Sequence, residues 1–183
     1  RQNLSLTETV PAVEMTTTKN ENAEKKPVKP EKKNITTKTL VTMKHKGEKI
    51  SALTAYDFLM ARYLDEAGID LMLVGDSLGN VIQGNATTLT VTLDEMIYHA
   101  KIVRKAVKKA LLVVDLPFMS YHVDLKESVR NCGRVMKETG ADAVKLEGGE
   151  RIAEVVKHLV KVGIPVMGHL GLTPQSVNAL GGY

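Results

Sequence analysis

The sequence is poor in the features that mark several large classes of protein. A single cysteine, Cys132, excludes an internal disulfide bond and any zinc site built from several thiolates. No apolar run approaches the roughly 20 residues that a membrane-spanning helix needs. The glycines Gly75, Gly79 and Gly84 are too far apart for a dinucleotide-binding or P-loop fingerprint. We therefore expect a cytoplasmic protein of a reducing compartment, with no membrane partner.

An excess of positive charge is confined to the N-terminal part of the chain. Residues 1–40 hold eight Lys or Arg against five Glu, whereas the rest of the 183 residues hold 17 basic and 16 acidic side chains. Because residues 1–40 have almost no periodic apolar residues, we expect a disordered basic tail, with its boundary at residue 34, before a folded domain over 35–183. Its glutamates argue against an organelle transit peptide, and Met15 is a candidate initiator. The balanced charge of the domain gives no reason to expect a nucleic-acid partner.

Five apolar runs each end at a polar residue that can do chemistry, and they lie at 51–57, 71–77, 111–115, 143–147 and 164–169. Segments with the spacing of amphipathic helices separate them, so the alternation predicts an α/β fold with a parallel sheet covered by helices. In a TIM (β/α)8 barrel, the C-terminal ends of the strands build the active site, and a full barrel needs about 250 residues. We therefore expect only about the first five strands of a barrel. Function is expected at the strand ends, at Asp76, Asp115, Lys145, Glu147 and His169.

Helix boundary signals support the alternation. Thr92 and Glu95 have the spacing of a capping box, and Thr173-Pro174 is typical of an N-cap followed by proline at the first helical position. Residues 77–91, rich in Gly, Asn and Thr, predict a long loop. The expected helices are 58–67 closed by Gly68, 93–109, one from Asp124 to before Gly140, and one from Glu150 to before Gly163.

The strand-end residues favour a metal site that handles an anion. Asp76 and Asp115 end successive strands, and neighbouring carboxylates favour Mg²⁺, which binds through one or two carboxylates plus the substrate. Lys145 and Glu147 are two apart on one strand and so point to the same side, where they could place a cation on an anionic substrate and an acid beside the metal. His169 could orient a base, donate a proton or be structural. Singly, such residues are often helix caps, surface ion pairs or structural histidines, but their joint placement on four strands favours a site.

Four segments resemble the successive motifs of the ketopantoate hydroxymethyltransferase (3-methyl-2-oxobutanoate hydroxymethyltransferase) family. They are LVGDSLG at 73–79, DLPFM at 115–119, VKLEGG at 144–149 and GHLGLTPQS at 168–176, and LTAYD at 53–57 fits the family's first strand. The resemblance runs from about residue 36 to Tyr183. It implies a TIM barrel, Mg²⁺, 5,10-methylenetetrahydrofolate as cosubstrate, a step of pantothenate biosynthesis and a homo-oligomer, usually a decamer.

The resemblance also implies roles for individual residues. The family's metal environment matches Asp76, Asp115 and Glu147, and its substrate contacts match Asp76, Ser77, Asp115 and Lys145. In the implied reaction, a base removes a proton from C3 of 3-methyl-2-oxobutanoate, Mg²⁺ stabilises the enolate, and the enolate takes the one-carbon unit to give 2-dehydropantoate.

The general base and the last strands of the barrel lie outside the resemblance. The family's base is a glutamate on a later strand, beyond Tyr183, so no residue here receives that role and His169 is a candidate auxiliary. We expect this chain alone to be inactive.

Two alternatives stay open. One is a truncated, non-catalytic fragment of the enzyme. The other is a lyase like phosphoenolpyruvate mutase and isocitrate lyase, which the absence of their cysteine-bearing lid motif disfavours.

Overall fold

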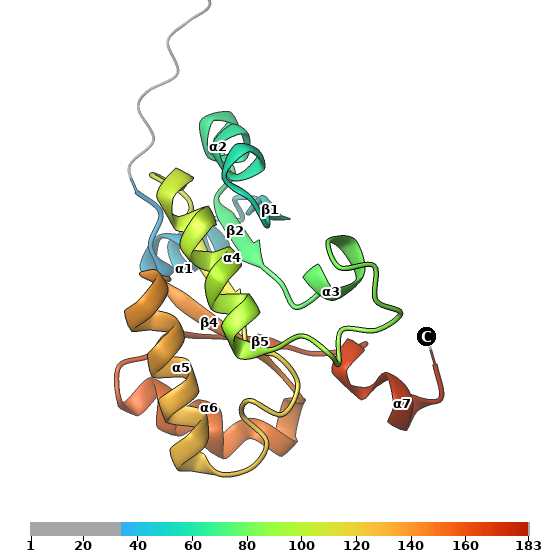
Figure 1. Cartoon of the computed structure of the whole chain (residues 1–183). Helices are drawn as coiled ribbons and strands as arrows, with labels where there is room; N and C mark the ends of the chain where they lie inside the picture. The colour runs from blue at the N-terminus through green and yellow to red at the C-terminus, as the bar shows by residue number, and fades with distance from the viewer. Residues whose placement is uncertain (1–33, 183) are drawn as a thin grey trace, which may run out of the picture. The chain divides into compact units, whose positions relative to one another are not determined.

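The computed structural model of the chain describes residues 34–182, so the tail predicted over residues 1–34 lies almost wholly outside the described residues. Within the described range, the strands form one sheet in the order β1-β2-β3-β4-β5, and every neighbouring pair is parallel (Figure 1). The strands are β1 Ala52–Thr54, β2 Leu71–Val74, β3 Leu111–Asp115, β4 Ala143–Glu147 and β5 Val166–His169. Chain order and spatial order coincide, as they do in a (β/α) barrel. The prediction of an α/β fold with about the first five barrel strands is confirmed.

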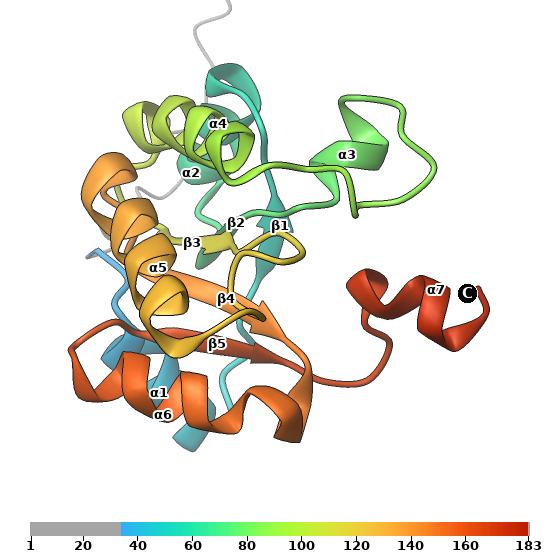
Figure 2. The same cartoon turned by 60° about the horizontal axis from the view of Figure 1, so that its bottom comes forward.

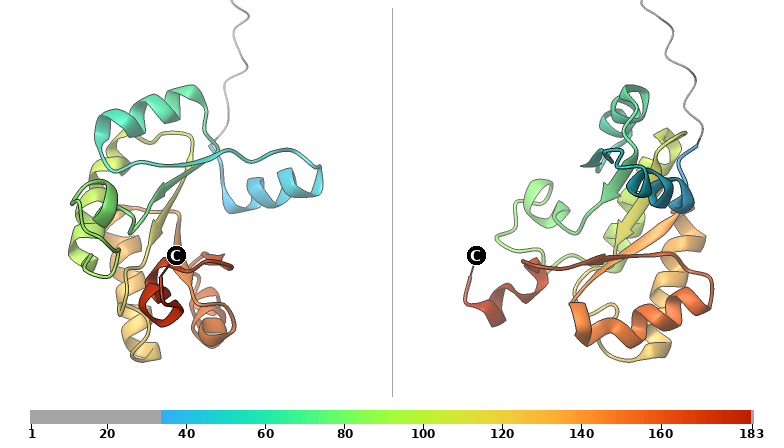
Figure 3. Two further views of the ribbon diagram at one scale, coloured as in Figure 1. Left: turned by 90° about the vertical axis from the view of Figure 1, so that its right-hand side faces the viewer. Right: turned by 180° about the vertical axis from the view of Figure 1, so that it is seen from behind.

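The helices of the described residues include crossover helices, which connect successive strands and cover one face of the sheet. They are α1 Thr37–His45, α2 Phe58–Ala67, α3 Leu78–Val81, α4 Leu93–Ala106, α5 Leu125–Thr139, α6 Ala153–Lys161 and α7 Val177–Leu180, with the 3₁₀ turns η1 Gly149–Ile152 and η2 Pro174–Ser176. The larger crossover helices α2, α4, α5 and α6 follow one another along that face, each in contact with the next (Figures 1 and 2). By contrast, α3 and α7 lie beyond the carboxyl ends of the strands (Figures 2 and 3). None of the described helices is long and apolar enough to cross a bilayer.

Side chains of the strands alternate between two faces of the sheet, as the pleat requires. The face under the helices carries the main core, which includes Met72, Val74, Leu112, Val114, Val144 and Leu146. The opposite face carries a smaller cluster of Leu71, Leu111, Val113 and Ala143, against which Ile35 and Leu40 pack. Residues 111–115 and 143–147 thus place every second residue on the face away from the crossover helices, where the strand-end polar groups also lie.

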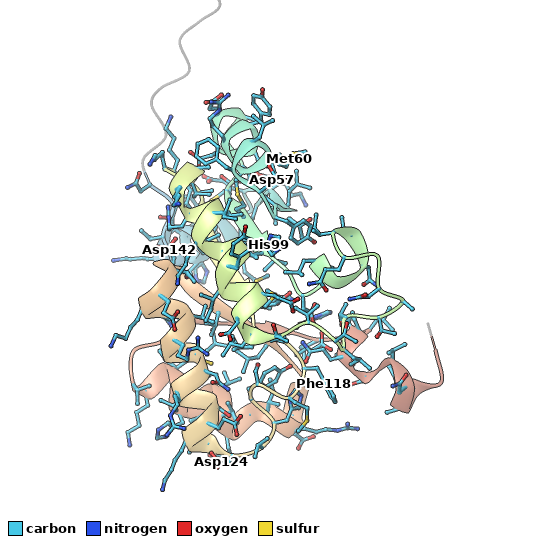
Figure 4. All side chains as sticks on the ribbon, viewed as in Figure 1. Asp57, Met60, His99, Phe118, Asp124 and Asp142 are labelled. Carbon is cyan, nitrogen blue, oxygen red and sulfur yellow. The ribbon has the colours of Figure 1, made fainter. Side chains whose placement is uncertain are left out.

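Most helix boundaries follow the predicted signals. Asp57, beside Met60 in Figure 4, caps α2 by accepting the Met60 N–H at 2.9 Å, and Gly68 closes that helix in the left-handed conformation with φ of 88°. Asp124 caps α5 by accepting the Glu127 N–H at 2.7 Å. The sequence therefore locates both ends of these helices because their caps are local interactions.

The end of α4 differs from the prediction. This helix stops at Ala106 and not at residue 109. The buried carboxylate of Asp65 accepts the N–H groups of Lys108, Lys109 and Ala110 at 2.9–3.0 Å, so a distant side chain takes over donors that would otherwise continue the helix. Sequence periodicity does not report such a contact.

Three further predictions on local structure were wrong. The segment 77–91 is not all loop, because α3 forms at its start. The helix expected from Glu150 begins as the turn η1, and Thr173 makes no side-chain cap to η2 although Pro174 does start it.

The first described helix, α1, begins at Thr37, just after the predicted boundary at residue 34, although the composition of residues 1–40 gave no sign of a helix. Thr36 and Thr39 form a capping box there, with side-chain to main-chain bonds of 3.1 and 3.2 Å.

Candidate functional site

Strand register brings four of the predicted site residues onto one face of the sheet. Asp115 pairs with Lys145 across β3 and β4, and Glu147 pairs with His169 across β4 and β5. Paired residues point to the same side of a sheet, as do residues two apart on one strand. The four side chains therefore project from the carboxyl ends of neighbouring strands toward one region, as the sequence predicts.

Asp115 and Lys145 form a buried ion pair. Lys145 Nζ lies 2.5 Å from Asp115 Oδ1, and the two side chains are only 14% and 6% exposed. Burial raises the pKa of Asp115 to about 6, and the nearby carboxylate of Asp76 adds to this effect, while the Lys145 ammonium opposes it. The ammonium thus offsets only part of the cost of a carboxylate held away from water.

Asp76 follows β2 and lies next to Asp115. Its main-chain N–H donates to Asp115 Oδ2 at 3.3 Å, and its own carboxylate is buried. The chain can approach this closely because residue 75 is glycine, where a Cβ would stand 3.3 Å from Asp115 Oδ2 and 2.9 Å from Ser77 Oγ. The structure therefore gathers Asp76, Ser77 and Asp115 around a strand end that has no room for a larger side chain.

Ser77 is held by the first strand-to-helix connection. The hydroxyl of Tyr56 lies 2.7 Å from Ser77 Oγ, and the ring nitrogen Nδ1 of His99 lies 2.7 Å from the Tyr56 carbonyl oxygen. His99 comes from α4, where Figure 4 labels it. Tyr56 thus holds the Ser77 hydroxyl and is itself anchored by His99, and the sequence assigned no role to Tyr56 or His99.

Glu147 is buried at the end of β4, beside His169. Burial raises the pKa of Glu147, and the main-chain N–H of Gln175, which donates to Glu147 Oε1 at 2.6 Å, opposes the rise. His169 Nδ1 lies 3.4 Å from Glu147 Oε2 without the alignment of a hydrogen bond, and it has no other hydrogen-bond partner among the described residues. The pair therefore sits close enough to interact electrostatically, with His169 Nδ1 buried against the carboxylate.

Gln175 and Tyr121 complete the cluster, and sequence reasoning missed both. The Gln175 side-chain amide donates to Asp76 Oδ2 at 2.8 Å and to the Leu116 carbonyl oxygen at 2.9 Å. The Tyr121 hydroxyl lies 2.9 Å from Gln175 Oε1 and 2.9 Å from the Glu147 carbonyl oxygen. Gln175 lies within the GHLGLTPQS segment, but nothing in that segment indicates that it reaches the end of β2.

The cluster carries more negative than positive charge in a buried setting. The carboxylates of Asp76, Asp115 and Glu147 are each about 5% exposed or less, and Lys145 is the ammonium that an ion pair places among them. Buried anions without matching cations are costly, so the arrangement suits a further cation, and carboxylate oxygens are the ligands that Mg²⁺ prefers.

The three carboxylates are not gathered around one point. No group of three or more His, Cys, Asp or Glu side chains in residues 34–182 is placed to hold a metal ion together. Two carboxylates plus substrate and water are enough for Mg²⁺, so the chemistry of Asp76 and Asp115 is compatible with the ion, and the metal roles of all three carboxylates stay predictions.

A pocket of about 330 Å³ adjoins the cluster. Glu147 and Gln175 line it together with Phe118, Arg151 and Asn178, among others. Figure 4 shows Phe118 on the connection after β3, the same connection that carries Tyr121. The pocket thus meets the cluster at Glu147 and Gln175, at the rim where the sequence places chemistry.

Comparison with known proteins gives one family. The family described as ketopantoate hydroxymethyltransferase matches residues 34–183. A 3-methyl-2-oxobutanoate hydroxymethyltransferase of Flavobacterium johnsoniae is 60% identical over 82% of this chain and 56% of its own length. The enzyme of the same name from Trichodesmium erythraeum is 61% identical over 81% of this chain and 57% of its own length. The chain therefore spans little more than half the length of these relatives.

Solved structures support the fold. A 2,3-dimethylmalate lyase, a member of the phosphoenolpyruvate mutase/isocitrate lyase superfamily, superimposes with a TM-score of 0.54 at 17% identity, over 72% of this chain and 52% of the lyase. An oxaloacetate acetylhydrolase superimposes with a TM-score of 0.52 at 14% identity, over 70% of this chain and 50% of that protein. At such low identity the likeness concerns the fold alone.

Proposed function

The chain belongs to the ketopantoate hydroxymethyltransferase family, and from that premise we propose that residues 35–183 are the N-terminal part of a (β/α) barrel catalytic domain. The reaction proposed for the whole enzyme transfers a hydroxymethyl group from 5,10-methylenetetrahydrofolate to 3-methyl-2-oxobutanoate, giving 2-dehydropantoate. The observation that carries the proposal is the buried carboxylate cluster at the strand ends, in the family's motifs and beside a pocket.

We assign the metal to Asp76 and Asp115, with Glu147 nearby. Both aspartates are buried, adjacent and able to offer hard oxygen ligands. When bound, Mg²⁺ would act as a Lewis acid that offsets the charge developing on the keto oxygen as C3 loses its proton. The aspartates' part is to hold the ion at a strand end whose geometry is fixed before the substrate arrives.

Lys145 and Ser77 receive the substrate's oxygens in this proposal. The Lys145 ammonium is nearly buried, so its attraction for a carboxylate is less screened than at the surface. Its bond to Asp115 keeps it at the carboxyl ends of β3 and β4. In this proposal the Tyr56 hydroxyl donates to Ser77 Oγ, so the Ser77 O–H is left to donate to the substrate.

No described residue is assigned the removal of the proton from C3. A general base must reach that proton directly or through one water. Glu147 already accepts a hydrogen bond from Gln175, and Lys145 is engaged with Asp115. His169, beside Glu147, is the candidate auxiliary. Because no described residue takes the role of the base, this chain alone is expected to bind substrate without turning it over. We further propose that the whole enzyme forms a homo-oligomer, a decamer as is usual in the family. Its proposed location is the cytoplasm.

Calorimetric titration tests the binding part of this proposal. The 183-residue chain should bind 3-methyl-2-oxobutanoate in the presence of Mg²⁺ and lose that binding in EDTA, whereas 3-methylbutanoate, which lacks the keto oxygen, should show no metal-dependent binding. Asp115→Asn should abolish the effect. Asp94→Asn, which removes a surface carboxylate paired with Arg134, should leave it intact.

A coupled assay with methylenetetrahydrofolate tests turnover. We expect no 2-dehydropantoate from this chain alone. Robust turnover that disappears in His169→Ala would instead make His169 the base, and metal-independent binding of the keto acid would contradict the site assignment.

A further inference from the structure

We propose that Gln175 is a positioning residue that orients the carboxylates of Asp76 and Glu147 for a divalent cation. The inference rests on the proposed metal assignment and concerns a residue to which the sequence motifs give no role. Gln175 is 7% exposed, and it contacts the segments that follow β2 and β3 as well as the end of β4.

Every polar group of the Gln175 side chain has a partner that fixes its direction. The two amide hydrogens go to Asp76 Oδ2 at 2.8 Å and to the Leu116 carbonyl oxygen at 2.9 Å. The amide oxygen faces the Tyr121 hydroxyl at 2.9 Å. Acceptors on one side and a donor on the other leave a single satisfactory orientation of the amide.

The main chain of Gln175 holds the second carboxylate. Its N–H donates to Glu147 Oε1 at 2.6 Å. Pro174 begins the turn η2, so the N–H of the next residue is among those that a helical turn leaves without an internal partner. Gln175 thus holds one oxygen of Asp76 with its side chain and one oxygen of Glu147 with its backbone. The second oxygen of each carboxylate makes no bond to Gln175.

A neutral amide suits this role better than a charged donor. Lys145 offsets the charge of Asp115 when it binds that carboxylate, whereas Gln175 orients Asp76 without bringing a positive charge. The surplus of negative charge is therefore kept for an ion. Groups that orient ligands in this way typically change metal affinity by about 10–100-fold when they are removed.

Equilibrium Mn²⁺ binding to the whole 183-residue chain, followed by electron paramagnetic resonance, tests the proposal. Gln175→Met keeps the length of the side chain but removes its hydrogen bonds, and we expect it to bind Mn²⁺ about 10–100-fold more weakly than the unmodified chain. The line shape of bound Mn²⁺ should also change, because it reports the arrangement of the ligands. Circular dichroism and the thermal midpoint in EDTA monitor the fold, so a loss of affinity caused by unfolding is recognised.

Gln83→Met is the matched control. Gln83 also donates from its side-chain amide to a carboxylate, Glu95 Oε1, at 2.8 Å, but at the start of α4 and away from the cluster. Its substitution should leave both affinity and line shape unchanged. If Gln175→Met fails to fold, Tyr121→Phe frees the Gln175 amide oxygen and should weaken Mn²⁺ binding in the same direction.

The outcomes separate this inference from the proposed function. Unchanged affinity and line shape in Gln175→Met, or in Tyr121→Phe where that variant is needed, would overturn the role of Gln175 and leave the metal assignment standing. If the unmodified chain binds no Mn²⁺, or if Asp115→Asn binds it equally well, the metal assignment and this inference are both overturned.

Discussion

Replacing Asp115 with asparagine should make the stability of the metal-free fold fall less as the pH rises toward neutral. Burial raises the pKa of Asp115 to about 6 from the ordinary 3.8, so the folded state resists ionisation of this side chain more than the unfolded state does. For a carboxyl whose pKa is higher in the folded state, the stabilising contribution is present below the unfolded pKa and is lost as the pH rises through the folded pKa. At neutral pH the ionised Asp115 therefore destabilises the fold.

The size of the effect follows from the two pKa values. Their difference corresponds to about 3 kcal/mol of unfolding free energy at full ionisation. At about pH 4.5 only about 1 kcal/mol of this is lost, and at about pH 7.5 nearly all of it. Asparagine cannot ionise, so the stability gap between Asp115→Asn and the unmodified chain should shift by about 2 kcal/mol in favour of the variant between these conditions.

Urea unfolding in EDTA at the two pH values measures this gap. Asp94→Asn serves as the control because its carboxylate is 80% exposed and paired with Arg134 at the surface, where such pairs contribute little. Adding Mg²⁺ should stabilise the unmodified chain by mass action and leave Asp115→Asn unaffected. The substitution also removes the partner of the Lys145 ammonium, which costs the variant a similar amount of stability at both pH values. A stability difference between Asp115→Asn and the unmodified chain that does not shift in favour of the variant as the pH rises would refute the reasoning.

Other consequences of the structure can be checked separately. Gly75→Ala should weaken metal and keto-acid binding in calorimetry, because a Cβ there would press on Asp115 Oδ2 and Ser77 Oγ, and unchanged binding would contradict the close approach. The Cys132 thiol is buried with its pKa raised to about 12, so it should react with an aromatic disulfide reagent only after urea unfolding. Thr92→Ala should lower the unfolding free energy by about 1 kcal/mol through loss of the capping box with Glu95, as urea unfolding would show. Deleting residues 1–33 should leave the thermal midpoint and Mn²⁺ affinity unchanged, because the family match begins at residue 34.

The sheet could be predicted because its determinants are local in sequence. Each strand is a short apolar run that stops at a polar residue, and the helices between strands announce their ends through caps such as Asp57, Asp124 and Gly68. The same alternation placed Asp115, Lys145 and Glu147 on one side, because side chains two apart on a strand share a face. The facing of strand side chains follows from their two-residue alternation, and helix caps are hydrogen bonds between residues close in sequence, so both can be recognised in the sequence.

The contacts that organise the site could not be predicted from the sequence. Gln175 bonds Asp76 across 99 positions of the sequence, and the Tyr121 hydroxyl meets Gln175 across 54. The Asp65 carboxylate, which ends α4, acts across more than 40. Such pairings depend on how loops after different strands fold back over the sheet, and no periodic pattern encodes them.

The buried carboxylates of the cluster lower the stability of the fold. A carboxylate on a strand face would normally be exposed or fully paired, yet Asp115 keeps a raised pKa even with Lys145 in contact. Gln175 brings no charge that would relieve this strain, although a basic residue at that position could. A cluster that served only to hold the sheet together would gain from such relief. The unbalanced, oriented set of carboxylates therefore supports the proposal that a cation binds there.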